Sequence, residues 1–158
     1  RGEALLRQEL IQEMVLDYLF SQSGAFYERL SVKQLIDESF TYSTTVEEHY
    51  NFTLISSNTD DPALFESTVK DMLEETKQLS IDEETFQRMR NKKIGELIWE
   101  LNSLEQTASQ FLHYFFADVN YFDRLSYLQN ISLDEVNHYI QHWIDQDRLT
   151  SFIIEKEA

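Results

Sequence analysis

The chain has no cysteine, one proline and three glycines among its 158 residues. The lack of cysteine excludes a disulfide framework, a thiolate metal site and a cysteine nucleophile. The scarcity of proline and glycine favours long helices over a turn-rich all-β fold. No apolar run reaches the length of a membrane span, and the first residues show no signal-peptide pattern. We therefore expect no membrane partner and a cytoplasmic location.

Basic residues are also few, with 13 Lys and Arg against 29 Asp and Glu, and the net charge is -16. Nucleic acid is excluded as a main partner, because phosphate binding needs clustered positive charge. A hydrophobic content of 42% excludes intrinsic disorder. The length suits one core, so residues 1–158 are expected to form a single domain.

Periodicity predicts the order of the elements. Apolar residues three and four apart predict a helix over 3–20, and Ser23 is expected to cap a short helix over 24–34. Alternating residues predict strands over 40–46 and 50–55, joined as an antiparallel hairpin. The chain opens in a helical pattern without a cap, so we expect it to be a piece of a longer chain.

The second half reads as helices followed by a strand. Three N-terminal signals stand out: Asp61 before Pro62, and two capping boxes, Ser80 with Glu83 and Ser132 with Glu135. A helix break is expected at 102–103 and a last strand at 149–156. The predicted class is α+β, an antiparallel sheet with helices packed on one face.

One spacing could suit a metal ion. His138 and His142 lie four residues apart on a predicted helix, one turn after Glu135. No glutamate stands between the histidines as a general base, and both fall off the apolar stripe. The favoured interpretation is therefore a solvated helix face.

Two other clusters have structural interpretations. A basic run could receive an acidic partner, but turn-spaced carboxylates favour local ion pairs; it comprises Arg88, Arg90, Lys92 and Lys93. An aromatic cluster is expected in the core or in an inter-domain face; it comprises Tyr114, Phe115, Phe116, Tyr121 and Phe122. No G-x-S-x-G elbow or Gly-rich phosphate loop is present, so no catalytic apparatus is visible.

Several phrases together resemble the insulinase-like (pitrilysin-type, M16) zinc metallopeptidases. They are "ALLRQELIQEMVLDYLFSQSGAFYERLSVKQLID", "HYNFTLISSNTDDPALFE", "TFQRMRNKKIGELIWELNSLEQTASQF" and "YFDRLSYLQNISLDEVNHY". The resemblance covers almost the whole chain in order. It is strongest to the C-terminal half of the bacterial proteins associated with modification of elongation factor P.

The resemblance implies two homologous α+β halves that enclose a chamber, with zinc held by H-x-x-E-H in the N-terminal half. None of this chain's histidines stands in that motif. The resemblance therefore implies the non-catalytic half, without a cofactor of its own and lacking its leading strand or strands. The implied partners are a zinc-bearing half, or a homologous subunit, and a peptide substrate.

The resemblance also points to substrate-holding positions. Active relatives carry an Arg and, seven residues later, a Tyr that hold the peptide. Aligned on "FYERL", these places fall on Ser31 and Glu38, which look degenerate because neither supplies a cation or a phenol. Arg29, Lys33 and Tyr42 lie nearby as candidate contacts of a peptide groove.

The resemblance thus implies a wall of a peptidase chamber, with peptide-binding capacity and no catalysis of its own. A binding or scaffold module from a parent without zinc is the alternative. A self-contained metal hydrolase built on Glu135, His138 and His142 is the third hypothesis.

Overall fold

The computed structural model describes residues 2–116 and 118–155. Its strands are β1 (Thr41–Val46) and β2 (Asn51–Ser56). Its α-helices are α1 (Gly2–Phe20), α2 (Ala25–Val32), α3 (Pro62–Glu75), α4 (Glu83–Glu100), α5 (Leu104–Phe116), α6 (Arg124–Asn130) and α7 (Leu133–His142). Short 3-10 helices span Thr76–Gln78, Tyr121–Asp123 and Gln146–Arg148.

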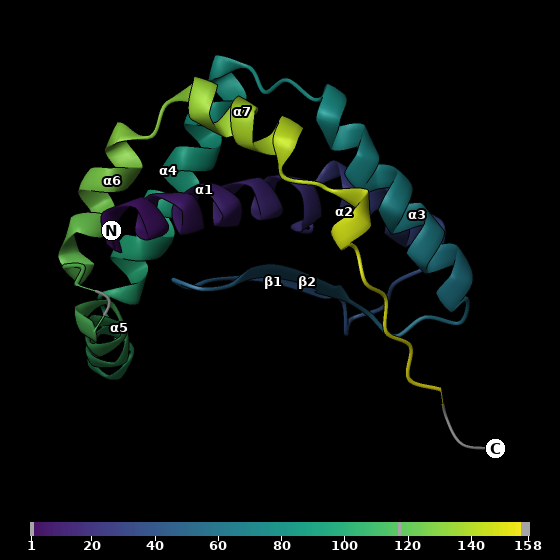
Figure 1. Ribbon diagram of the computed structural model, residues 1–158, viewed down its shortest axis with the longest axis horizontal. Coiled ribbons are helices and arrows are strands. Elements are labelled where there is room, and N and C mark those ends of the chain that lie inside the picture. Colours follow the sequence, from purple (N-terminus) through teal and green to yellow (C-terminus); the bar gives the residue numbers. More distant parts are fainter. Residues whose placement is uncertain (1, 117, 156–158) are drawn as a thin grey trace.

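The helices arch over one face of the β1–β2 hairpin, with α1 running between the sheet and the outer helices (Figure 1). The two strands are antiparallel, with Thr41 opposite Ser56 and Val46 opposite Asn51. The predicted α+β class and its helix-covered sheet are confirmed. The predicted last strand is wrong over residues 149–155, which form no strand; residue 156 lies outside the described residues.

Helix α1 is covered on every side along most of its length. Residues 9–20 are all buried or half-buried, and Leu10, Val15 and Phe20 are fully buried. The helix packs against β1, α2, α4, α6 and α7. An amphipathic pattern predicts one buried face, but here the sheet covers one side and helices cover the others.

Polar side chains of α1 fix the sheet beneath it. The Gln12 side chain, 2% exposed, accepts a hydrogen bond from the Thr44 hydroxyl at 2.5 Å. Five residues further along α1, the Asp17 carboxylate accepts a hydrogen bond from the Tyr42 hydroxyl at 2.8 Å. Burial and the bond to Asp17 raise the pKa of Tyr42, so its hydroxyl stays a neutral donor. These two bonds fix which face of β1 meets the helix, because a one-residue slip would turn both side chains away.

Carboxylates on the same helix bind the elements on the other side. The Lys93 ammonium of α4 lies 2.8 Å from the Glu13 carboxylate. The Tyr114 hydroxyl of α5 donates to Glu9 at 2.9 Å. The Arg124 guanidinium, 5% exposed, lies over the Tyr114 ring at 5.3 Å from its centroid. A buried charge is costly without such partners, so these contacts restrict where α4, α5 and α6 can pack.

The helix caps test the local predictions. Asp61 accepts from the Leu64 amide with Pro62 at the first helical position, and Ser132 forms the full capping box with Glu135, as predicted. Ser80 does not cap α4; Asp82 does, accepting from the Thr85 amide at 2.7 Å. A contact between α7 and the segment before α4 explains why Asp82 rather than Ser80 is the cap.

Asn137 on α7 holds the segment before α4 extended. Its side-chain oxygen accepts from the Ile81 amide at 2.7 Å, and its side-chain nitrogen donates to the Ile81 carbonyl at 3.0 Å. Ile81 therefore cannot take a helical place, and α4 begins only after Asp82. This contact joins residues 56 apart in the sequence, which a local pattern cannot reveal.

Gly24, rather than the predicted Ser23, is the N-cap of α2, and it makes no side-chain cap bond. The turn brings Gly24 against the end of α1. A Cβ atom at this position would lie 2.5 Å from the Leu19 carbonyl oxygen and 2.9 Å from that of Tyr18. Only glycine allows this approach, which sets the angle between α1 and α2.

Gly24→Ala should therefore destabilise the fold by about 1–3 kcal/mol, the cost of forcing an extra methyl group into a filled site. Gly95 lies inside α4, where an added Cβ would meet nothing within 4 Å. Gly95→Ala is the matched control and should stabilise by about 0.5–1 kcal/mol through helix propensity. Urea unfolding of both variants measures the difference, and equal effects would contradict the close approach at Gly24.

Candidate functional site

The corner between α2 and β1 positions the candidate site. The Gln34 backbone is left-handed, with φ 56, and its amide donates to the Ser31 carbonyl at 2.9 Å. The Leu35 amide donates to the Leu30 carbonyl at 3.0 Å, and both leucines are buried. This pair of bonds is a Schellman ending, with Gln34 at the position that usually holds glycine. It turns the chain from α2 toward the sheet.

The turn that follows is fixed by hydrogen bonds. The Asp37 carboxylate accepts from the Ser39 amide at 2.8 Å and from its hydroxyl at 2.5 Å. The Asn58 amide, just beyond β2, donates to the Ser39 hydroxyl at 2.8 Å. The bonds from Ser39 hold the pKa of Asp37 below its ordinary value, so this carboxylate is ionised at neutral pH. The segment before β1 is thus preorganised.

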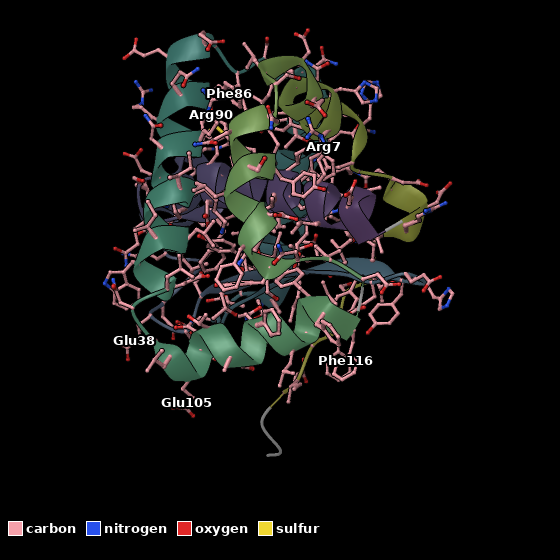
Figure 2. The ribbon with its side chains drawn as sticks, turned by 90° about the vertical axis from the view of Figure 1, so that its left-hand side faces the viewer. Arg7, Glu38, Phe86, Arg90, Glu105 and Phe116 are labelled. Atoms are coloured by element: carbon pink, nitrogen blue, oxygen red, sulfur yellow. The ribbon has the colours of Figure 1, made fainter. Side chains whose placement is uncertain are left out.

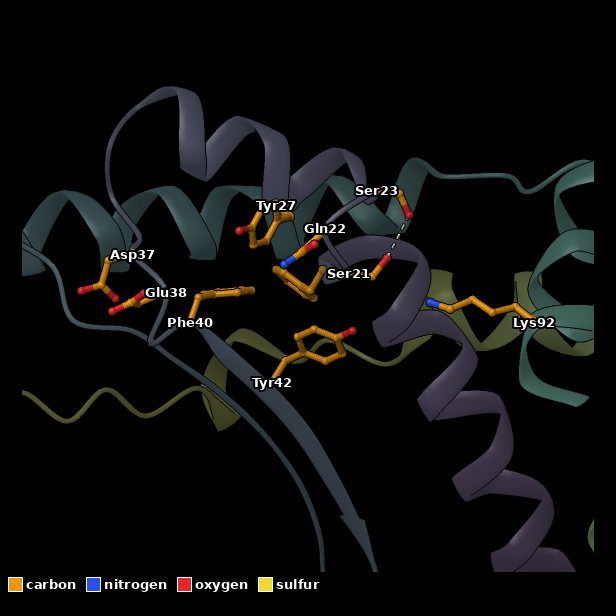
Figure 3. A pocket seen from close by; sticks show the side chains of 10 residues that line it. Ser21, Gln22, Ser23, Tyr27, Asp37, Glu38, Phe40, Tyr42 and Lys92 are labelled. Atoms are coloured by element: carbon orange, nitrogen blue, oxygen red, sulfur yellow. Dashed lines mark hydrogen bonds between the residues drawn. The ribbon is translucent and has the colours of Figure 1, made fainter. Parts of the chain in front are cut away.

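A concave pocket of about 780 Å³ opens between this turn, α2 and the end of α1 (Figure 3). Aromatic rings from α1, α2 and β1 line it. The Phe20 ring lies 6.2 Å from that of Phe40 and 6.1 Å from that of Tyr42. The Tyr27 ring meets Phe40 edge-on at 5.7 Å. Phe20 is fully buried and the other three rings are half-buried, so Tyr27, Phe40 and Tyr42 supply the accessible part of the apolar floor.

Charges of opposite sign line the pocket at separate places. Asp37 and Glu38 come from the turn, and Lys92 comes from α4 on the other side of the aromatic rings (Figure 3). Both carboxylates are exposed. The nearest partner of Lys92 is Glu96, with a long separation of 3.8 Å. The pocket therefore combines an apolar floor with an acidic and a basic rim.

The structure brings together only some of the predicted site residues. Glu38 and Tyr42 line the pocket. Arg29 instead forms a two-bond ion pair with Glu75 of α3, at 2.6 and 2.8 Å. Ser31 lies at the penultimate position of α2 and is exposed. Lys33 follows as the C-cap of that helix, also exposed.

Sequence reasoning missed Tyr27, Asp37 and Lys92 as pocket residues. The acidic pair before the first strand was a local signal that could have pointed to Asp37. Nothing local connects Lys92 to the same site, because it belongs to a helix that begins 27 residues after β2 ends.

The residues proposed for a metal site are used in other ways. Arg7 of α1 donates to both carboxylate oxygens of Glu135, at 2.6 and 2.8 Å. His138 and His142 are exposed, their rings stack at 4.4 Å, and a ring nitrogen of His142 contacts the His138 carbonyl at 2.7 Å. The solvated-face interpretation of the two histidines is confirmed.

Zinc does not fit this donor set, because Arg7 holds the carboxylate and the histidines turn to each other and their own helix. Within residues 2–116 and 118–155, no group of three or more acidic or histidine side chains is arranged to hold a metal ion. Over the same residues, no helix has the length and apolar character needed to cross a membrane.

The residues of the basic run on α4 contact several different partners. Arg88 pairs with Glu84 one turn earlier, and Lys93 faces Glu13 of α1. The Arg90 guanidinium lies over the Phe86 ring, 5.0 Å from its centroid; Figure 2 labels the two side chains, which lie near each other. The prediction of local charge pairing holds for Arg88, Lys92 and Lys93, whose ammonium group lies 3.4 Å from Glu96 in addition to its tertiary contact with Glu13.

No family profile matches the chain. The uncharacterised zinc protease YmfH of Bacillus subtilis is 38% identical over 149 residues, which is 94% of this chain and 35% of that protein. A structure from Alicyclobacillus acidocaldarius, described as an M16-like peptidase, aligns with a TM-score of 0.80 and 26% identity over 89% of this chain and 34% of the other. The chain is therefore similar in sequence to a zinc protease and in fold to an M16-like peptidase.

A further structural match shows the fold alone. A structure from Bordetella parapertussis, described as the inactive peptidase domain of a zinc protease, aligns with a TM-score of 0.64 and 14% identity. The alignment covers 89% of this chain and 75% of that one. The chain spans about a third of the length of the Bacillus relative.

Arg7 of α1 forms an ion pair with Glu135 of α7. The structural role of Glu135 in this pair can be tested through the pH dependence of stability. The bonds from Arg7 lower the pKa of Glu135 from 4.5 to about 2. A carboxyl group whose pKa is lower in the folded than in the unfolded state stabilises the fold at pH values above the unfolded pKa. This contribution is lost as the pH falls from about 4.5 toward 2. Arg7→Gln should therefore cost about 0.5–1 kcal/mol at pH 7, as a partly exposed pair does, and much less near pH 2.

Arg88→Gln is the matched control, because its pair with Glu84 is exposed and lies within one helix. Urea unfolding at a series of pH values should show a pH-dependent loss for Arg7→Gln and almost none for Arg88→Gln. A loss of equal size at pH 7 and pH 2 would contradict the assignment.

Proposed function

We propose that this chain is a non-catalytic domain of a zinc peptidase, one domain over residues 1–158 of a longer cytoplasmic protein. It forms a wall of a chamber opposite a zinc-bearing half or homologous subunit, and it contacts the peptide. The observation that carries the proposal is the engagement of Glu135, His138 and His142 in structural contacts. The zinc implied by the relatives' names then belongs to another part of the parent chain.

The substrate-holding positions support a passive role. Ser31 and Glu38 stand where the family resemblance implies an Arg and a Tyr. A serine has no cationic group, and a carboxylate repels a developing oxyanion rather than stabilising it. In this proposal the domain contributes shape and binding contacts to the chamber.

Exposed apolar surface is available for a neighbouring domain. Tyr114 and Tyr121 are buried, as the core interpretation requires, but Phe115 is 60% exposed and Phe116 83%. Leu104, at the start of α5, is 86% exposed. Contiguous apolar surface of this kind marks interaction sites in soluble proteins. We assign this face of α5 to the contact with the rest of the parent protein.

A binding or scaffold module is the second candidate function. The observation that favours it is the pocket itself, which offers aromatic and charged groups without requiring zinc anywhere in the parent. The two candidates differ in the zinc content of the full-length protein.

The four histidines of this chain are exposed, so they can be replaced without disturbing the core. In the full-length protein, joint replacement of His49, His113, His138 and His142 by alanine should leave bound zinc and peptide hydrolysis within about twofold of the unmodified protein. Zinc is measured by elemental analysis and hydrolysis with a mixed peptide library. Loss of zinc in the variant would overturn the proposal, and absence of zinc from both proteins would favour the scaffold.

A further inference from the structure

We propose that the pocket between α2, β1 and α4 selects peptides by a basic side chain, which lies on the aromatic floor with its charge between Asp37 and Glu38. This inference rests on the proposed function, since it specifies which peptides the domain contacts. The ligand class follows from the chemistry and placement of the lining groups.

The acidic rim attracts a cation. Asp37 is held by Ser39 and stays ionised, and Glu38 beside it is exposed and makes no hydrogen bond within residues 2–116 and 118–155. Phe20, the last residue of α1, and residues 21–23 after it line the same pocket, so the negative end of the α1 helix dipole lies at its wall. A guanidinium or ammonium group here would receive charge-assisted hydrogen bonds from an acceptor that has no competing partner.

The aromatic floor suits the stem and the charge of such a side chain. Tyr27 and Phe40 are half-buried and meet edge-on, so part of each ring is accessible from the pocket. Aromatic rings attract cations through their negative faces, and they also cover the methylene groups of Arg or Lys. A neutral apolar residue would use the rings but leave the carboxylates without a partner.

Lys92 makes the two ends of the pocket opposite in charge. Its ammonium group stands across the rings from Asp37 and Glu38 in Figure 3, and its pair with Glu96 is long, at 3.8 Å. A basic residue at that end would be repelled, whereas an acidic residue or a main-chain carbonyl would be accepted. The favoured peptide therefore has its positive charge at the Glu38 end and none at the other.

Other occupants fit less well. Nucleic acid would bring phosphate groups to the acidic rim, and a second copy of this chain would bring a net charge of -16. A cationic peptide is the partner that the charge of both the pocket and the chain favours.

The test uses two dye-labelled nonapeptides of glycine, serine and alanine, one with a central arginine and the other with citrulline, its neutral isostere. Binding to the full-length protein is measured by fluorescence anisotropy at 0.15 M salt, with a chelator to prevent hydrolysis. Screening at this salt limits long-range attraction to about 8 Å, so differences report the local site. The arginine peptide should bind about tenfold more tightly.

Glu38→Gln should remove most of this preference and weaken the arginine peptide about five- to tenfold, leaving the citrulline peptide within twofold. Glu105→Gln is the matched control, because Glu105 is exposed on α5, which lies near the N-terminal end of α1 in Figure 1, whereas the pocket lies at the C-terminal end of that helix. It should change neither affinity. An equal effect of the two substitutions would show general charge attraction and overturn the inference.

Tyr27→Leu distinguishes this inference from the proposed function on which it rests, since the substitution removes the ring without a change in charge. It should weaken both peptides by about threefold or more. Equal affinity of the two peptides, with both weakened by Tyr27→Leu, would overturn the basic selectivity and leave peptide contact intact. If neither Tyr27→Leu nor Glu38→Gln changed the affinity for either peptide, the basic selectivity and the proposed peptide contact would both be overturned.

Discussion

The fold depends on the enclosure of α1 over residues 9–20. A helix that is covered on all sides must find partners for every polar group it carries, because an unpaired buried group costs free energy. Gln12 and Asp17 meet the sheet, and Glu13 meets α4. These bonds limit each neighbouring element to one position, so the polar residues of α1 determine how the rest of the molecule is arranged around it.

The candidate pocket is a product of the same constraint. The bond from Tyr42 to Asp17 fixes β1 under α1, and the close approach at Gly24 fixes α2 beside the end of α1. Between these two fixed elements, the chain must turn sharply, which the left-handed Gln34 achieves. The space left at this corner is the pocket, and its aromatic floor consists of the half-buried rings of Tyr27, Phe40 and Tyr42, of which the last two pack against the buried core.

Local signals predicted the class, the hairpin and the caps at Asp61 and Ser132, because each of these depends on neighbours in the sequence. The error at Ser80 arose from a contact with Asn137 that lies beyond any local window. The last strand was predicted from composition alone, yet residues 149–155 pair with neither strand. Glu38 and Tyr42 could be chosen from the sequence, whereas Lys92 could not, because only the packing of α4 brings it to the pocket.

The enclosure of α1 also sets an order of events during synthesis. Arg7 and Glu135 are 128 residues apart, so the first helix of this chain leaves the ribosome long before its last partner exists. At typical rates of synthesis this delay is on the order of ten seconds. During that time the apolar residues of α1 that later face α4, α6 and α7 lack these partners. The helix that organises the finished fold is therefore also a segment whose apolar surface stays uncovered by its own partners in the nascent chain.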